Sequence, residues 1–252
     1  MFGRTNQGNG WQFAADGQTE AVNRLLYLSE NGEVLSLLEG AYGTGKSTVL
    51  KRTAAELNGL GRRTICQNVA ALDCRAVLWH LCGALSVFGE TDSGTSELML
   101  QLRNELLARA RCQHPTVVLL DDTDLAQRDI DVVLNLMVSI AEASEGGVSV
   151  IAATEQPLTL SLHRRTTLSV RLERLREQES IEFAVRRLAH LECDIDRMTE
   201  TGWRALADLS EGLPAQLLRI CRILQVVMST QPGAVDAAVV HAAARELLPQ
   251  AA

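Results

Sequence analysis

The sequence has no run of about eighteen apolar residues, so we expect no segment of it to cross a bilayer as a helix. Its opening residues, Met-Phe-Gly-Arg, lack the apolar stretch of a secretion signal. We therefore expect a cytoplasmic protein, with peripheral attachment to the inner membrane as the alternative.

The cysteines contain no Cys-x-x-Cys pair, a spacing that often marks a zinc or redox site. The nearest grouping with metal-site spacing, Cys74, His80 and Cys82, lacks a fourth ligand. We expect reduced thiols in the core, with zinc as the less favoured alternative. The six cysteines are Cys66, Cys74, Cys82, Cys112, Cys193 and Cys221.

Lysine is scarce as well: of the 24 basic residues only Lys46 and Lys51 are lysine, and the rest are arginine. An ammonium group sits beside terminal phosphates as a compact point charge, whereas a guanidinium is planar and bulkier. A lysine at position 46 therefore suits a phosphate contact.

The charge balance is acidic in the first part of the chain. The first 159 residues carry 12 basic and 19 acidic residues, which accounts for the whole net charge of −7. Such a region does not favour broad electrostatic capture of nucleic acid. DNA is kept as an alternative partner that the net charge does not indicate.

What the sequence does contain, over its first 172 residues, is short apolar segments alternating with segments of helical periodicity. This alternation predicts an α/β fold, with a parallel sheet covered by helices on both faces and ligands at the carboxyl ends of the strands. The predicted strands are residues 33–38, 64–68, 116–120, 148–153 and 168–172, and the predicted helices are residues 19–31, 46–57, 75–85, 96–111 and 130–143.

After residue 172 the strand signals stop. Four helical patterns follow, at residues 177–190, 200–210, 214–228 and 234–248. We expect a core domain over residues 1–172, entered through Trp11 and Phe13, and a small all-helical lid domain over residues 173–252. Residues 89–96 are hydrophilic and predict a surface loop.

The segment at residues 40–47 matches the phosphate-binding pattern GxxxxGKS, and it lies between a predicted strand and a predicted helix. Backbone N–H groups and the helix N-terminus would surround the phosphates of ATP. Lys46 would reach the β and γ phosphates, and Ser47 would bind Mg²⁺. The predicted nucleotide-binding residues here are Gly40, Ala41, Tyr42, Gly43, Thr44, Gly45, Lys46, Ser47 and Thr48.

Residues 117–122 are four apolar residues followed by two aspartates, which suits the metal side of such a site. Asp121 would hold Mg²⁺ through water. Asp122 occupies the position where many ATPases of this layout carry a glutamate that activates the attacking water, and its side chain is one methylene shorter. Either hydrolysis is slow or the base lies elsewhere. Glu39, just before the glycine loop, is a weaker candidate for the base, and its alternative interpretation is a strand-end residue.

Two further positions are candidates for sensing the γ-phosphate. Thr154 ends a predicted strand and either contacts the phosphate from a neighbouring strand end or is a turn residue. The basic run His163-Arg164-Arg165 precedes the last strand, where one protomer of a ring could offer Arg165 to its neighbour's phosphate. The alternative is a solvated basic turn.

With these motifs in place, the chain resembles an AAA+-type ATPase, and within that group it is similar to the ExeA-like general secretion pathway ATPases. The resemblance runs from about residue 16 to residue 228 and includes residues 18–28, residues 171–179 and the segment Ser210-Glu211-Gly212-Leu213-Pro214. It implies an ATP hydrolase that forms homo-oligomers. The family's second sensor arginine is Ala215 here, so the second sensor is either missing or supplied by Arg219, one turn later. The membrane and peptidoglycan-binding portions of longer members are expected to be absent.

Three functions are compatible with this sequence. The first is an assembly or secretion motor acting on an unknown protein partner. The second is a DNA-associated helper of transposition or replication, which ATP-dependent DNA affinity would reveal. The third is a nucleotide switch resembling STAND NTPases, suggested by the paired aspartates, although the winged helix and repeats usual in such proteins are not expected here. ATP is preferred to GTP because we find no guanine-specific motif.

Overall fold

The computed structural model describes residues 15–87, 93–127, 129–156, 162, 164–166 and 168–245. Trp11, Phe13 and His163 lie outside these ranges, as do residues 89–92 of the predicted loop at residues 89–96 and the end of the helix predicted at residues 234–248.

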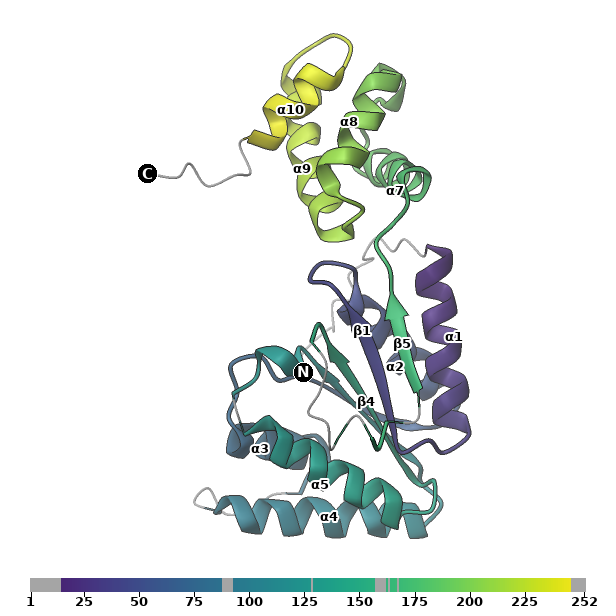
Figure 1. Ribbon diagram of the computed structural model, residues 1–252, viewed down its shortest axis with the longest axis vertical. Helices are drawn as coiled ribbons and strands as arrows, with labels where there is room; N and C mark the ends of the chain where they lie inside the picture. Colours follow the sequence, from purple (N-terminus) through teal and green to yellow (C-terminus); the bar gives the residue numbers. More distant parts are fainter. Residues whose placement is uncertain are drawn as a thin grey trace, which may run out of the picture. The chain divides into compact units, whose positions relative to one another are not determined.

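The described residues divide into two compact units, one spanning Gly17–Leu172 and the other formed by the residues from Glu173 onward together with Ala15 and Asp16. The first contains a five-stranded parallel sheet with its helices, and the second is built of helices (Figure 1). In the first unit the elements are α1 (Asp16–Glu30), β1 (Leu35–Gly40), α2 (Lys46–Gly59), β2 (Arg63–Asn68), α3 (Cys74–Ala84), α4 (Thr95–Arg111), β3 (Thr116–Asp121), the 3₁₀ turn η1 (Thr123–Leu125), α5 (Ile130–Ala143), β4 (Val148–Thr154) and β5 (Leu168–Leu172).

The sheet has the strand order β2-β3-β4-β1-β5, and every neighbouring pair is parallel. The prediction of a parallel sheet in an α/β fold is therefore confirmed. Because β1 lies between β4 and β5, the strand that leads into the glycine loop is an interior strand with neighbours on both sides. The carboxyl end of β1 is therefore fixed by pairing with β4 on one side and β5 on the other.

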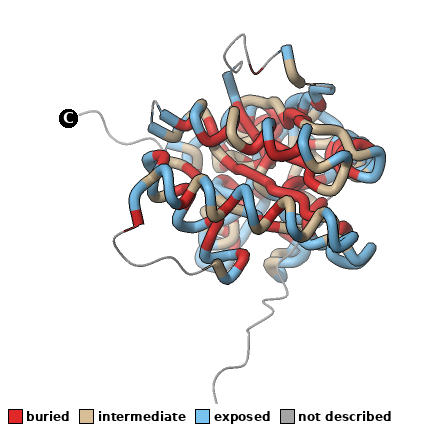
Figure 2. The backbone as a smooth tube through the Cα atoms, turned by 90° about the horizontal axis from the view of Figure 1, so that it is seen from below, coloured by how far each residue is buried: buried red, intermediate tan, exposed pale blue. Residues whose placement is uncertain are grey.

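Helices cover both faces of this sheet, as the sequence predicts. Side chains alternate along a strand, so Val118 and Leu120 of β3 pack on one face and Val117 and Leu119 on the other. The first face is covered by α3, α4 and α5, and the second by α1 and α2. Buried residues, red in Figure 2, follow the strands and the inward sides of these helices. Strands buried on both faces explain the continuous apolar runs of the sequence.

The predicted first strand, residues 33–38, is displaced by two residues at both ends. In the structure β1 includes Glu39 and Gly40, because Glu39 pairs with Thr154 of β4 and with Arg171 of β5. Glu33 instead donates its backbone N–H to the carbonyl oxygen of Leu28 and lies in the turn that follows α1. Glu39 is thus a strand residue, as its alternative reading held.

The second unit is a helical bundle with its own core. Leu188, Leu206, Leu217 and Leu224 are among its fully buried side chains. The helices pack with one another through the apolar sides that the 3.6-residue periodicity predicts. Its elements are α7 (Glu177–His190), the 3₁₀ turn η2 (Ile195–Arg197), α8 (Glu200–Ser210), α9 (Pro214–Thr230) and α10 (Ala237–Arg245).

The turn between α8 and α9 requires a glycine. Gly212 has φ +69, and a Cβ there would lie 2.2 Å from the carbonyl oxygen of Leu175. The Leu175 N–H in turn donates to the Gly212 carbonyl at 2.8 Å. This contact ties the segment that enters α7 to the start of α9, with Pro214 at the first helical positions.

The last helix begins later than predicted. Residue 234 was its expected start, but Val235 forms an isolated parallel bridge with Met198 and donates its N–H to Arg197. α10 therefore begins at Ala237, after Asp236, whose side chain accepts a hydrogen bond from the N–H of Val239. A tertiary contact decides this boundary, and the local pattern could not reveal it.

Two cysteines contradict the expectation that all six lie in the core. Cys66 and Cys112 are exposed, whereas Cys74, Cys82 and Cys221 are buried. Cys66 is exposed because β2 is an edge strand, and Cys112 because it follows the end of α4. All six thiols are free of disulfides.

The longest helices of both units, α4 and α9, have 17 residues each. Within the described ranges, no helix is both long enough and apolar enough to span a membrane. The cellular location stays a prediction.

Candidate nucleotide-binding site

The predicted phosphate loop connects the carboxyl end of β1 to the first residue of α2. Gly43 and Gly45 have φ values of 86° and 102°, which L side chains rarely adopt, so the backbone favours glycine at these two positions. No side chain caps the N-terminus of α2 at Gly45. The first N–H groups of the helix are thus available to an anion, where the helix dipole favours negative charge.

Lys46 is folded back onto this loop. Its side chain is buried at 7% exposure, and Nζ donates to the carbonyl oxygens of Gly40 at 2.7 Å and Ala41 at 3.3 Å. The Thr44 hydroxyl also donates to Ala41, at 2.9 Å. The loop therefore satisfies two of its own carbonyl groups, and the ammonium lies within the turn that would surround the phosphates.

Tyr42 and Thr48, the other predicted nucleotide contacts, are exposed. Tyr42 is 64% exposed at the tip of the loop. Thr48 lies in the first turn of α2, and its backbone N–H donates to Gly45. The surroundings of these two side chains do not show whether either one contacts the nucleotide.

The two predicted metal ligands lie together. The Ser47 side chain hydrogen-bonds to the Asp121 carboxylate, although the two residues are far apart in sequence. Burial raises the pKa of the Asp121 carboxyl, as does the neighbouring Asp122, whereas the Ser47 hydrogen bond and the Lys46 charge lower it. A buried carboxylate beside a hydroxyl is a set of hard oxygen donors, which fits Mg²⁺, and a cation there would favour the ionised carboxylate.

Asp122 has a left-handed backbone, with φ 56 and ψ 45, at the start of the turn after β3. One of its carboxylate oxygens accepts a hydrogen bond of 2.8 Å from Nδ2 of Asn68, the last residue of β2. Its backbone N–H donates to the Asp121 carboxylate at 3.1 Å. The predicted base is therefore half-buried, beside the metal carboxylate and held by an amide from the next strand.

Asn68 is a residue of this site that the sequence analysis missed. In the sheet it pairs in register with Asp121, so the ends of β2 and β3 bring the two polar side chains to one edge. A polar residue at the carboxyl end of a predicted strand could have marked Asn68 as a candidate site residue. That it lies beside Asp121 and Asp122 follows only from the strand order.

Thr154 ends β4, which lies between the strand of the phosphate loop and the strand of Asp121. The Thr154 side chain is fully buried, and its hydroxyl donates to the Gln156 carbonyl at 2.6 Å. Thr154 therefore lies at a strand end between the two motifs, as a sensor would, and it also makes a turn contact, as the alternative interpretation expects. Its role as a sensor stays a prediction.

Of the two candidate arginines, Arg165 is the one in the same unit as the phosphate loop, and the structure does not bring it to that loop. The Arg165 guanidinium forms a two-pronged ion pair with Glu142 of α5, with Nε 3.0 Å from one carboxylate oxygen. Arg165 precedes β5, at the amino-terminal edge of the sheet. Arg219 is exposed on α9 in the helical unit.

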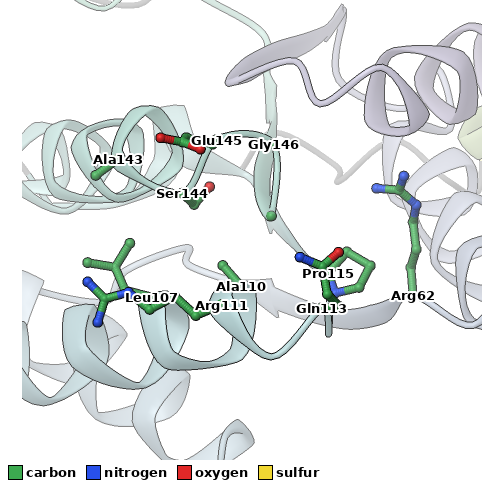
Figure 3. Close-up of a pocket in the computed structure, with 11 residues that line it drawn as sticks. Arg62, Leu107, Ala110, Arg111, Gln113, Pro115, Ala143, Ser144, Glu145 and Gly146 are labelled. Carbon is green, nitrogen blue, oxygen red and sulfur yellow. The ribbon is translucent and has the colours of Figure 1, made fainter.

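A pocket of about 560 Å³ lies in the sheet unit but away from the phosphate loop (Figure 3). Its lining comes from the residues just before β2, β3 and β4 and from the last turn of α4, so it is at the amino-terminal edge of the sheet. It contains none of the predicted site residues. In Figure 3, the lining side chains include Arg62, Arg111, Gln113, Ser144 and Glu145.

Comparison with known proteins places this site in context. The family model of the AAA domain matches residues 30–162, a segment that includes the phosphate loop and both aspartates. A search of curated proteins gives no match.

Several solved structures share the fold. Cdc6p from Pyrobaculum aerophilum has 14% sequence identity and a TM-score of 0.77, over 96% of this chain and 70% of that one. ORC1 from Aeropyrum pernix, solved in complex with DNA, has 18% identity and a TM-score of 0.70, over 93% of this chain and 66% of that one. The RuvB Holliday junction branch migration motor from Thermotoga maritima has 14% identity and a TM-score of 0.60, over 93% and 70%. At these identities the likeness concerns the fold alone.

Proposed function

This chain belongs to the AAA domain family, and we propose that it is a magnesium-dependent ATPase that couples ATP binding and hydrolysis to assembly or secretion-type remodelling of a protein partner. One observation carries the ATPase proposal. Lys46, Ser47 and Asp121 form a cluster at the carboxyl ends of β1 and β3, although they come from two separate motifs. Ligands of open parallel sheets bind at this edge.

In this proposal the loop at residues 40–48 holds the phosphates, and Lys46 provides the one ammonium among them. Ser47 and, through water, Asp121 would hold Mg²⁺, which would supply positive charge against the phosphates. Asp122 takes a proton from the attacking water, and the Asn68 amide orients its carboxylate. Thr154 senses the γ-phosphate. Since aspartate is shorter than glutamate, the proposed turnover is slow.

The proposal of a protein partner rests on the resemblance to ExeA-like secretion ATPases. In the proposed cycle of this chain, ATP binding closes the helical lid, with Arg219 as second sensor. Protomers then associate so that Arg165 reaches a neighbour's phosphate. The net charge of −7 agrees with this choice, because it does not attract nucleic acid.

A DNA-associated helper is the second candidate. Two of the similar structures are an ORC1 protein in complex with DNA and a Holliday junction branch migration motor. Their low identity gives this observation less weight than the resemblance in motifs.

The experiment that tests the function is steady-state ATP hydrolysis with magnesium, with and without DNA, alongside light scattering with a nonhydrolysable analogue. We expect slow turnover that DNA does not change, with larger particles when the analogue is present. Turnover that DNA stimulates would replace the protein-partner proposal by the DNA-associated one. Analogue binding without any turnover would favour the STAND-like switch.

The Arg165–Glu142 ion pair leads to a second prediction. If Arg165 serves a neighbour's nucleotide, it must leave Glu142, and an exposed ion pair contributes little stability. Glu142→Gln should therefore raise ATPase activity only about two- to fivefold, most clearly at protein concentrations where assembly is incomplete. The measurement is turnover as a function of protein concentration.

The matched control for Glu142→Gln is Glu105→Gln, which removes an ion pair with Arg109 on the surface of α4. It should leave the concentration dependence unchanged. If Glu142→Gln behaves like this control at every concentration, Arg165 does not act between protomers.

A further inference from the structure

Gln18 is a buried polar residue that lies outside both the phosphate loop and the segment containing the two aspartates. It lies in the first turn of α1, in the same unit as the phosphate loop, and is 7% exposed. Its Nε2 donates a hydrogen bond of 3.3 Å to the carbonyl oxygen of Thr44, inside the phosphate loop. A glutamine from outside the motif therefore contacts the backbone that would hold the nucleotide.

The next residue in the loop, Gly45, lies close to the same Gln18 side-chain amide. Gly45 has φ +102, and a Cβ at this position would lie 2.7 Å from Gln18 Nε2. The glycine leaves space for the Gln18 amide as well as allowing the backbone conformation. Gln18 thus fills the space beside the peptide bond that joins Thr44 to Gly45.

The geometry of this peptide bond decides what the contact does. A trans peptide is planar, so its C=O and N–H point in opposite directions. Because Gln18 holds the Thr44 oxygen, the N–H of Gly45 is directed away from α1. Without that restraint the peptide would turn more readily, since glycine tolerates φ values of either sign.

We propose that Gln18 is a positioning residue for the phosphate site, which fixes the Thr44–Gly45 peptide so that the Gly45 N–H faces the bound phosphates. This inference rests on the proposed function, because it assumes that the loop binds a nucleotide. Phosphate loops bind through such inward N–H groups. Gln18 itself touches no phosphate and acts through the loop.

This role has a distinctive kinetic signature. The peptide has the same orientation in the ground state and in the transition state, so its contribution is uniform binding. Loss of Gln18 should raise KM and the dissociation constants of both ATP and ADP by similar factors, and leave kcat nearly unchanged. A residue needed only for folding would not separate KM from kcat in this way.

The test compares two substitutions with the parent protein. Gln18→Met keeps the length of the side chain but cannot donate to the Thr44 oxygen, and one hydrogen bond corresponds to about a 2- to 10-fold loss of affinity for both nucleotides. Gln18→Glu keeps the shape but cannot donate when ionised, and its negative charge should cause a larger loss. Calorimetry with ADP and with a nonhydrolysable ATP analogue, together with steady-state kinetics, measures both.

The matched control is Gln225→Met. Gln225 also donates from Nε2 to a backbone carbonyl at 3.3 Å, that of Leu191, but in the helical unit. It should leave nucleotide affinity unchanged. If Gln18→Met does not fold, as a melting curve of the ligand-free protein would show, Gln18→Glu carries the test.

The outcomes separate this inference from the proposed function. If Lys46→Ala binds ATP as the parent does, the site itself is wrong. If Lys46 is required but the folded Gln18 variants bind both nucleotides as the parent does, only the role of Gln18 is overturned. A fall in kcat at unchanged affinity would also overturn it, because the contact would then act in the transition state alone.

Discussion

Replacing Lys46 by alanine is expected to abolish tight binding of ATP. The Lys46 ammonium is the cation that the structure places inside the phosphate loop, buried and bonded to the carbonyls of Gly40 and Ala41. Charge-assisted hydrogen bonds are each worth about 1.5–3 kcal/mol, so losing those to two phosphates should weaken binding about 100-fold or more. Titration calorimetry with a nonhydrolysable ATP analogue measures this.

The sequence offers a well-matched control for this substitution. Lys51 is the other lysine of the chain, and it lies exposed in the same helix, α2. Lys51→Ala should bind the analogue with parental affinity. Because Lys46 also donates two hydrogen bonds within the loop, a melting curve must show that Lys46→Ala is folded. If folded Lys46→Ala binds the analogue with parental affinity, the phosphate site is not at this loop.

Replacing Asp122 by asparagine is expected to leave ATP binding intact and to remove turnover. Asparagine has the same shape, and its amide oxygen can still accept the hydrogen bond that Asn68 donates to Asp122. It cannot take a proton from water, and general-base catalysis typically contributes a factor of about 10²–10⁴. Single-turnover hydrolysis of labelled ATP, combined with calorimetry, separates the loss of chemistry from any loss of binding.

A second carboxylate near the loop makes this experiment decisive. Glu39 lies in β1, one residue before Gly40, and pairs in register with Thr154. If Asp122→Asn hydrolyses ATP at the parental rate, Asp122 is not the base, and Glu39→Gln becomes the variant to measure. If Asp122→Asn is inactive and Glu39→Gln is not, the carboxylate after β3 is the base.

The sequence by itself predicted the features that depend on consecutive residues. The GxxxxGKS pattern lies between β1 and α2 as expected, and the apolar run ending in Asp121 and Asp122 is the buried strand β3 with its turn. The alternation of strands and helices was enough to predict the parallel sheet with two covered faces. Local periodicity and turn chemistry are properties of short segments, so they can be read without knowing the neighbours.

Only the tertiary structure decided which separated residues meet. Asn68 reaches Asp122 because β2 and β3 are adjacent, and Cys66 is exposed because β2 is the edge of the sheet. Gln18 contacts the loop because α1 packs on the face that also carries α2. The strand order and the placement of helices follow from burying all the apolar surfaces at once, which is a property of the whole chain. No pattern within one segment contains that information.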